Sequence, residues 1–223
     1  MSPAIIVSYD GTPNDEDALA LGRALGATGA KLELAYVRHS TEFDSGREAL
    51  AQHDAERRLE HGAAWLEQPD IARHVVLSAS TGEGLARLAE DEQAGMIVFG
   101  SDYRTPPGRV EPGTSAQHLL EGGPVAVAVA PAGVRASADL AINAIAVAAS
   151  DGDGAASATA QALAGKLGAE VVGLGSGEPD LIVVGSQSTG PRGRIALSGS
   201  TRSQLADARS AVLVVPHDKP VEF

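Results

Sequence analysis

The strongest constraint on the fold of this chain is an internal repeat. The stretch from Met96 to Pro131 aligns without a gap with the stretch from Leu181 to Pro216, at a constant offset of 85 residues. The matched landmarks are Gly100 with Gly185, Ser101 with Ser186, Pro106 with Pro191, Gly108 with Gly193, Arg109 with Arg194 and Pro131 with Pro216. Self-similarity at a fixed spacing indicates one structural unit written more than once. We therefore expect two related units in this chain.

The beginnings of the two halves also resemble each other. Ala4–Val37 and Ala144–Leu174 each contain an apolar strand pattern, an Asp-Gly turn, an alanine-rich helix pattern, a glycine break and a second strand. In the first helix pattern Ala18, Leu21 and Leu25 recur at three- and four-residue spacing, which is typical of one apolar helix face. The continuous apolar runs at the strands favour parallel strands that are covered on both sides.

The second half is much shorter than the first. Ninety residues separate Asp10 from Gly100, whereas 34 separate Asp151 from Gly185, so 56 residues are absent from the second unit. In the first unit this interval predicts a helix over Arg47–Glu67, a strand over His74–Ala79 and a helix over Gly82–Gln93. The second unit should therefore lack one strand and two helices.

Strands that alternate with helices through short loops predict an α/β fold with parallel sheets and helices on both faces. We predict two tandem Rossmann-like units. The expected boundaries are a complete domain over residues 1–133 and a truncated domain over residues 140–218, joined by the polar stretch Ala132–Asp139. Ligands of such sheets bind beyond the carboxyl ends of the strands, where the strand order reverses. This rule brings Asp10, after the first strand, close to Gly100, after the fourth.

Composition excludes several classes of function. The formal net charge of −12 argues against a nucleic-acid binder, because phosphate neutralisation needs clustered Lys and Arg. The chain has no cysteine, which excludes disulfides and thiol chemistry. We find no signal peptide and no run of about 20 apolar residues that could span a bilayer, so we expect a cytoplasmic protein without membrane contact.

The loop that follows the fourth strand of the first unit is the best candidate for a ligand site. It begins at Gly100 and ends at a helix start with Gly113, Thr114 and Ser115. Glycines allow the backbone to approach a ligand closely, and a helix start exposes N–H groups that suit an anion. The guanidinium groups of Arg104 and Arg109 suit phosphate oxygens.

This loop is similar to the signature of the universal stress protein family. In that signature a glycine, two residues, a second glycine, nine residues and a Gly-Ser or Gly-Thr pair follow the fourth strand. Gly100 matches the first glycine and Gly113-Thr114 the final pair, whereas Tyr103 replaces the second glycine. The first strand IVSYDG, the second strand GAKLELAYV and the last strand VAVAVAP also resemble the family, so the resemblance covers nearly the whole chain in two copies.

The resemblance implies units similar to adenine nucleotide alpha-hydrolases, with a five-stranded parallel sheet of order 3-2-1-4-5 in the first unit. It also implies that units pair through their last strands, Val125–Ala130 and Ala211–Val215, within one chain as a pseudo-dimer or between chains as a homodimer.

In nucleotide-binding members the strand-one aspartate and the end of strand two hold adenine, and the glycine loop holds ribose and phosphates. The cofactor site implied for this chain therefore contains Asp10, Val37, Gly100, Gly113, Thr114 and Ser115, to which we add Gly108 and Arg109 from the repeated Gly-Arg pair. A tyrosine at position 103 would either block this site or reshape it.

Several interpretations stay open at this stage. Asp10 could equally be a turn residue that caps the first helix. Arg109 and Arg194 suit either solvated loops or ion pairs between the units. The second loop has Ser188 at the position of the missing glycine, and its last glycine, Gly199, is displaced by one residue, so the first unit is the better candidate for binding.

Catalysis and metal binding have no support in the sequence. A G-x-S-x-G elbow and a phosphate loop with a G-K-[ST] ending are both absent. The six histidines lack metal-ligand spacing, and most are expected at the surface.

Three functions remain. The first is a stress-response sensor or adaptor that binds ATP or AMP, with or without Mg²⁺, in the first unit and hydrolyses ATP slowly at most. The second is an interaction module of the same fold that works through a protein partner and binds no nucleotide. The third, a small enzyme, has the least support.

Overall fold

The computed structural model describes residues 3–42, 44–137, 140–148, 154–175, 177–206 and 208–223. The first half folds as β1 (Ile5–Ser8), α1 (Pro13–Gly26), β2 (Leu32–Arg38), α2 (Ser45–Trp65), β3 (Ala72–Leu77), α3 (Thr81–Asp91), β4 (Met96–Phe99), α4 (Thr114–Leu120) and β5 (Ala126–Val129). A short 3₁₀ helix, η1 (Val134–Ala136), follows. The second half folds as β6 (Ala144–Ala148), α5 (Ala155–Leu167), β7 (Glu170–Val172), β8 (Leu181–Val184), α6 (Gly199–Ala206) and β9 (Ala211–Val214).

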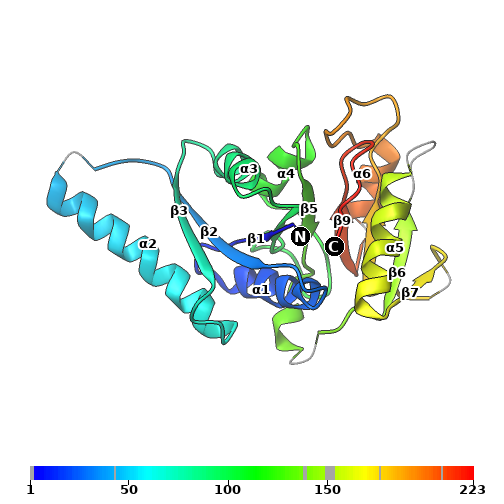
Figure 1. Cartoon of the computed structure of the whole chain (residues 1–223), viewed down its shortest axis with the longest axis horizontal. Coiled ribbons are helices and arrows are strands. Elements are labelled where there is room, and N and C mark those ends of the chain that lie inside the picture. The colour runs from blue at the N-terminus through cyan, green and yellow to red at the C-terminus, as the bar shows by residue number, and fades with distance from the viewer. Residues whose placement is uncertain (1–2, 43, 138–139, 149–153, 176, 207) are drawn as a thin grey trace.

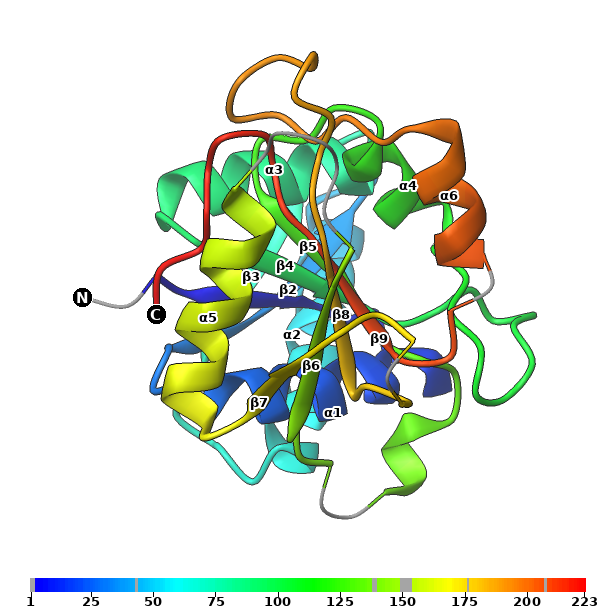
Figure 2. The ribbon, with the colours of Figure 1, turned by 90° about the vertical axis from the view of Figure 1, so that its right-hand side faces the viewer.

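All nine strands form one sheet of order β3-β2-β1-β4-β5-β9-β8-β6-β7 (Figures 1 and 2). The first five strands are parallel and have the order 3-2-1-4-5, which confirms the prediction for the first unit. The second half has four strands and two helices among its described residues. The loss of one strand and two helices is therefore confirmed as well.

The two halves meet at the only antiparallel strand pair in the described sheet, β5 with β9. Ala128 lies opposite Leu213 in this pair, and both side chains are fully buried. The last strands therefore join the units within one chain, as the family resemblance implies. The C-terminal tail crosses back over the second half, where the Val221 amide donates a hydrogen bond of 2.9 Å to the Thr159 hydroxyl.

Helices cover both faces of the sheet because successive strand residues point to opposite sides. In β1, Ile5 and Val7 belong to a core with α1, α2 and α5, whereas Ile6 belongs to a core with α3, α4 and α6. The N-terminal half of α2 extends beyond the sheet in Figure 1, and its Leu50 is 60% exposed.

Element boundaries differ from the predicted ones by a few residues. The strand predicted over His74–Ala79 runs over Ala72–Leu77, because its pairing with β2 starts at Glu33 opposite Ala72. Polar residues are accepted there because β3 is the edge strand of the sheet. No helix among the described residues has the length and apolar character that crossing a bilayer requires.

Candidate ligand site

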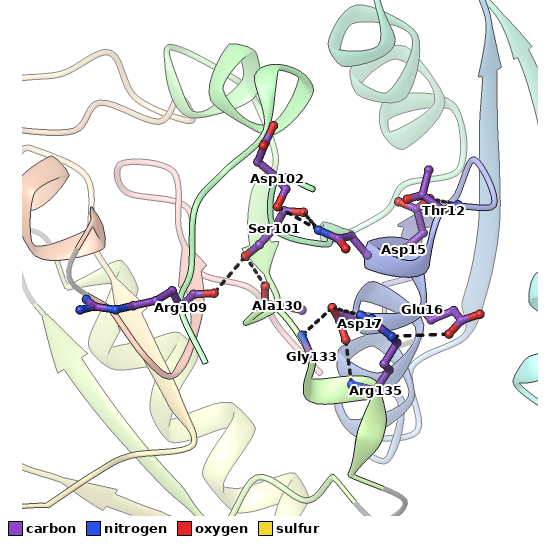
Figure 3. Close-up of polar contacts among 11 residues, drawn as sticks. Thr12, Asp15, Glu16, Asp17, Ser101, Asp102, Arg109, Ala130, Gly133 and Arg135 are labelled. Atoms are coloured by element: carbon purple, nitrogen blue, oxygen red, sulfur yellow. Dashed lines mark hydrogen bonds and ion pairs between the residues drawn. The ribbon is translucent and has the colours of Figure 1, made fainter. Parts of the chain in front are cut away.

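The strand order reverses at β1, whose neighbours β2 and β4 are both parallel to it. The chain leaves β1 through Asp10 and Gly11 and enters α1, whereas it leaves β4 through Gly100 into the long loop. The side chain of Asn14, in the first turn of α1, connects the two exits. Its Nδ2 donates hydrogen bonds of 2.8 Å to the Ser101 carbonyl oxygen and 2.9 Å to the Asp102 carbonyl oxygen (Figure 3).

Gly100 is a glycine because α1 lies directly on it. A Cβ at this position would overlap the carbonyl oxygen of Asn14. The missing side chain therefore admits the start of a helix, which is a packing role that needs no ligand.

Asp10 lies at the surface beside a second carboxylate, Asp15. The Oδ2 atom of Asp15 accepts hydrogen bonds of 2.8 Å from the Thr12 amide and 2.7 Å from the Thr12 hydroxyl, so it caps α1. The Asp10 amide lies 3.3 Å from the same oxygen. The pKa of Asp15 is raised to about 7, chiefly by burial and then by the hydrogen bond and negative charge of Asp10, against the opposite effect of Thr12. Asp15 therefore gains or loses a proton near neutral pH.

The backbone of Asp10 is held from the other side by α2. Arg58 Nη1 donates a hydrogen bond of 2.8 Å to the Asp10 carbonyl oxygen, and its guanidinium carbon lies 5.4 Å from the Tyr36 ring centroid. The turn that carries Asp10 is thus held by contacts from both neighbouring helices.

Gly113, Thr114 and Ser115 form the start of α4, with Gly113 as the N-cap residue. A Cβ at Gly113 would meet Asp102 Oδ2 at 4.0 Å, and no other atom outside its immediate neighbours lies within that distance. The other Asp102 oxygen, Oδ1, accepts a hydrogen bond of 3.0 Å from the Arg104 amide. This part of the loop therefore has free space, bordered by one carboxylate.

The middle of the loop contacts the second half of the chain. The Val110 amide donates a hydrogen bond of 3.1 Å to the Ala208 carbonyl oxygen. At the matching positions of the second unit, the Ile195 amide donates one of 2.9 Å to the Gly123 carbonyl oxygen. Each repeated loop thus forms a backbone hydrogen bond to the opposite unit. We name this pair of loops, residues 100–115 and 185–200, the reciprocal clasp.

A buried serine fixes each loop of the clasp to its own last strand. Ser101 Oγ donates a hydrogen bond of 2.7 Å to the Ala130 carbonyl oxygen, and Ser186 Oγ donates one of 2.7 Å to the Val215 carbonyl oxygen. Ser101 is 4% exposed and Ser186 is fully buried. The Gly-Ser pair that follows β4 in the first unit and β8 in the second therefore serves the clasp.

The repeated Gly-Arg pair lies in the same clasp. Gly108 adopts φ of +74° and donates a hydrogen bond of 2.8 Å to the Ala132 carbonyl oxygen, and Gly193 repeats both features, with φ of +68° and a bond of 2.7 Å to His217. The left-handed turn accounts for a glycine in both copies. The Arg109 side chain points away from Thr12 and Asp15 in Figure 3.

The remaining predicted residues are separated from the Asp10 turn. Val37 is 6% exposed and packs in the core against Gly84 of α3. Tyr103 is 71% exposed, and its ring centroid lies 4.8 Å from the Arg104 guanidinium carbon, so its ring lies at the surface. Asp151, the sequence counterpart of Asp10, lies outside the described residues.

Sequence reasoning missed Asn14, Asp15 and a buried ionic contact of α1. Asp17 is fully buried; its two carboxylate oxygens accept hydrogen bonds of 2.8 Å from the amides of Gly133 and Arg135, and the guanidinium of Arg135 forms a 2.8 Å ion pair with it (Figure 3). The Thr12-x-x-Asp15 spacing is a helix-start signal that could have revealed Asp15. The contact of Asp17 spans more than 100 residues and leaves no local signal.

A second buried acid lies at the opposite end of the strands. Glu33, 1% exposed, contacts Lys31 at 2.7 Å and His74 at 2.9 Å, and Glu92 lies 3.9 Å from His74. Most of the six histidines were expected at the surface, but His74 is only partly exposed, because it bonds to buried Glu33 on the neighbouring strand β2. Lysine and histidine already satisfy both oxygens of Glu33, so this cluster is a structural ion network.

Comparisons with known proteins agree with this architecture. The sequence model of the universal stress protein family matches residues 1–131, more than half of the chain. A universal stress protein from Archaeoglobus fulgidus DSM 4304 superimposes with a TM-score of 0.70 at 16% identity, covering 97% of this chain and 99% of that chain. A functionally unknown protein from Pseudomonas aeruginosa PAO1 superimposes with a TM-score of 0.55 at 14% identity, covering 97% and 93% of the two chains. No curated protein sequence matches the chain.

The fold, the strand order and the match over residues 1–131 together define the class: the chain belongs to the universal stress protein family. At the identities above, the two solved structures support the fold alone.

Proposed function

We propose that the first unit binds an adenine nucleotide, ATP or AMP, and that the protein acts as a sensor or adaptor in stress response. The observation that carries this proposal is the pairing of two features at the strand-order reversal. Asp10 is exposed at the exit of β1, and Gly113 borders free space in the loop that the Asn14 side chain connects to α1. In the proposed complex Asp10 accepts from the adenine amino group, and the backbone of Gly113–Ser115 faces ribose and phosphate.

The charges of the site favour the magnesium form of the nucleotide. Asp102 Oδ2 lies next to Gly113, so a bare phosphate there would meet a carboxylate. Mg²⁺ is commonly held by one or two carboxylates together with substrate phosphates. The oxygen donors present fit this ion, and Asp102 is the residue that would hold it. The proposed ligand is therefore MgATP, and binding should weaken when Mg²⁺ is removed.

Thermal unfolding with millimolar ATP, with and without Mg²⁺, tests the proposal. A ligand at about 100 times its dissociation constant adds about 2.7 kcal/mol to the free energy of unfolding, so the melting temperature should rise with MgATP. Gly113→Val should abolish the rise, because the new side chain fills the free space without backbone strain at φ of −69°. Gly199→Val, at the start of α6, is the matched control and should leave the rise intact.

The second candidate function is an interaction module that binds no nucleotide. The observation that favours it is the structural use of the signature loop: Asn14 occupies the side of Gly100, and the clasp engages Ser101, Gly108 and Val110. An unchanged melting temperature with ATP, ADP, AMP and cyclic AMP would contradict nucleotide binding and leave this candidate.

A further inference from the structure

The second half of the molecule has an apolar groove on the face of the sheet that carries α6. Its volume is about 370 Å³, and it is lined by Ala148, Leu174, Ile182, Val184, Leu205 and Val212 among others. Leu174 is 54% exposed and belongs to this contiguous apolar lining, which is more informative than a single exposed apolar residue. Arg209 is the charged residue of the lining.

The corresponding place in the first half is filled. The offset of 85 residues places Ile182 where the first half has Ile97 and Leu205 where it has Leu120. Ile97 and Leu120 share one core with α3, which buries Leu85, Leu88 and Ala89 against them. The second half has no counterpart of α3 in the sequence, so the sheet face that α3 covers in the first half is open in the second.

From this internal template we propose that the groove binds an amphipathic helix of a partner protein. The helix would present apolar residues at positions i, i+3 and i+4, the pattern of Leu85, Leu88 and Ala89 in α3. Such helix-in-groove recognition reuses the packing that helices and sheets use within one chain.

Charge indicates the character of the outer face of that helix. The groove is bordered by Arg209, which is exposed. The helix that fills the equivalent groove in the first half contains three acidic residues against one basic residue in its sequence TGEGLARLAED. In a chain of net charge −12, the exposed guanidinium of Arg209 at the groove attracts an acidic helix. The partner helix should therefore be acidic outside its apolar stripe.

A labelled peptide with the sequence of residues 80–93 of this chain is the probe, because it contains the one helix known to fit the equivalent groove. Its fluorescence anisotropy should rise on titration with the full chain, and added salt should weaken the binding. A peptide with Leu85→Glu and Leu88→Glu should not bind. The variants Leu174→Glu and Arg209→Glu of the protein should each weaken binding, by about tenfold for Leu174→Glu.

Val171→Glu is the matched control variant. Val171 is 45% exposed on β7, but it is aligned with Ile145, whose side chain lies in the core on the α5 face. This variant should bind the peptide like the unchanged chain. All three substituted residues are exposed, so circular dichroism and the melting temperature should confirm an intact fold.

The proposal is overturned if the peptide does not bind, or if it binds equally to the Leu174→Glu and Val171→Glu variants. Sedimentation that shows self-association dependent on Leu174, without peptide binding, would assign the groove to a second copy of the chain and overturn the proposal too. If a small apolar dye binds and the peptide does not, the groove is a small-molecule pocket and the proposal is overturned. Each result is independent of nucleotide binding in the first unit.

Discussion

The loop from Gly100 to Ser115 and its repeat from Gly185 to Ser200 have the same backbone contacts but different surroundings. Both hold a buried serine against their own last strand, and both donate a backbone hydrogen bond to the opposite unit. The first loop has acidic residues at Asp102 and Glu111, where the second has Gln187 and Ala196. The shared part of the loop joins the two units, and the part that differs gives the first loop the acidic groups on which the proposed nucleotide site rests.

The first unit also anchors the connection between the units through Asp17. Asp17→Ala should give the largest loss of stability, about 3–5 kcal/mol, because it leaves the Arg135 guanidinium and two backbone amides without their buried carboxylate. Glu16→Ala is the control, since Glu16 is half-exposed and lies 3.8 Å from Arg135, and it should cost less than about 1 kcal/mol. Urea unfolding measures both; equal losses would contradict the anchoring role.

The clasp predicts equal effects at its two serines. Ser101→Ala and Ser186→Ala should each lower the free energy of unfolding by about 1–3 kcal/mol, because each leaves a buried carbonyl oxygen without its donor. The comparison fails if one substitution is neutral while the other is costly, since the two loops would then differ in their joining role.

The Asp10–Asp15 pair predicts a smaller, pH-dependent effect in the first unit. The folded-state pKa of Asp15 is about 7, above its ordinary value of 3.8, so the folded chain binds the extra proton and loses stability as pH rises between these values. Asp15→Asn keeps an oxygen for Thr12 but carries no charge. The variant should be more stable than the unchanged chain at pH 8, and the difference should shrink toward pH 5. Melting temperatures across this range measure it; a constant difference would contradict a titrating Asp15.

Much of the fold could be predicted because the repeat presents the same strand and helix pattern in two aligned copies. Strand order, the missing elements and the join at the last strands all followed from aligned residues and the family resemblance. Domain boundaries at 1–133 and 140–218 stay a prediction, because one continuous sheet joins the halves and Lys219 of the tail donates a hydrogen bond to the Pro124 carbonyl oxygen of the first half.

The site was harder to predict, for a physical reason. In the sequence, a glycine at position 100 is compatible with either a phosphate or a helix packed against it. Only the position of Asn14 in the structure shows that a helix lies there. The Gly-Arg pair repeated in both units indicated a shared role, but two copies cannot tell a ligand contact from a join between units. The predicted site residues therefore stay a prediction, with Asp10 and Gly113–Ser115 as the part that the geometry favours.

Counting nucleotides per chain tests most directly whether the repeated loops join the units while only the first unit binds a ligand. Equilibrium dialysis with radiolabelled MgATP should give one nucleotide per chain. Asp10→Ala should reduce this number toward zero, whereas Arg194→Ala in the second loop should leave it at one. Two nucleotides per chain, or none, would contradict the account.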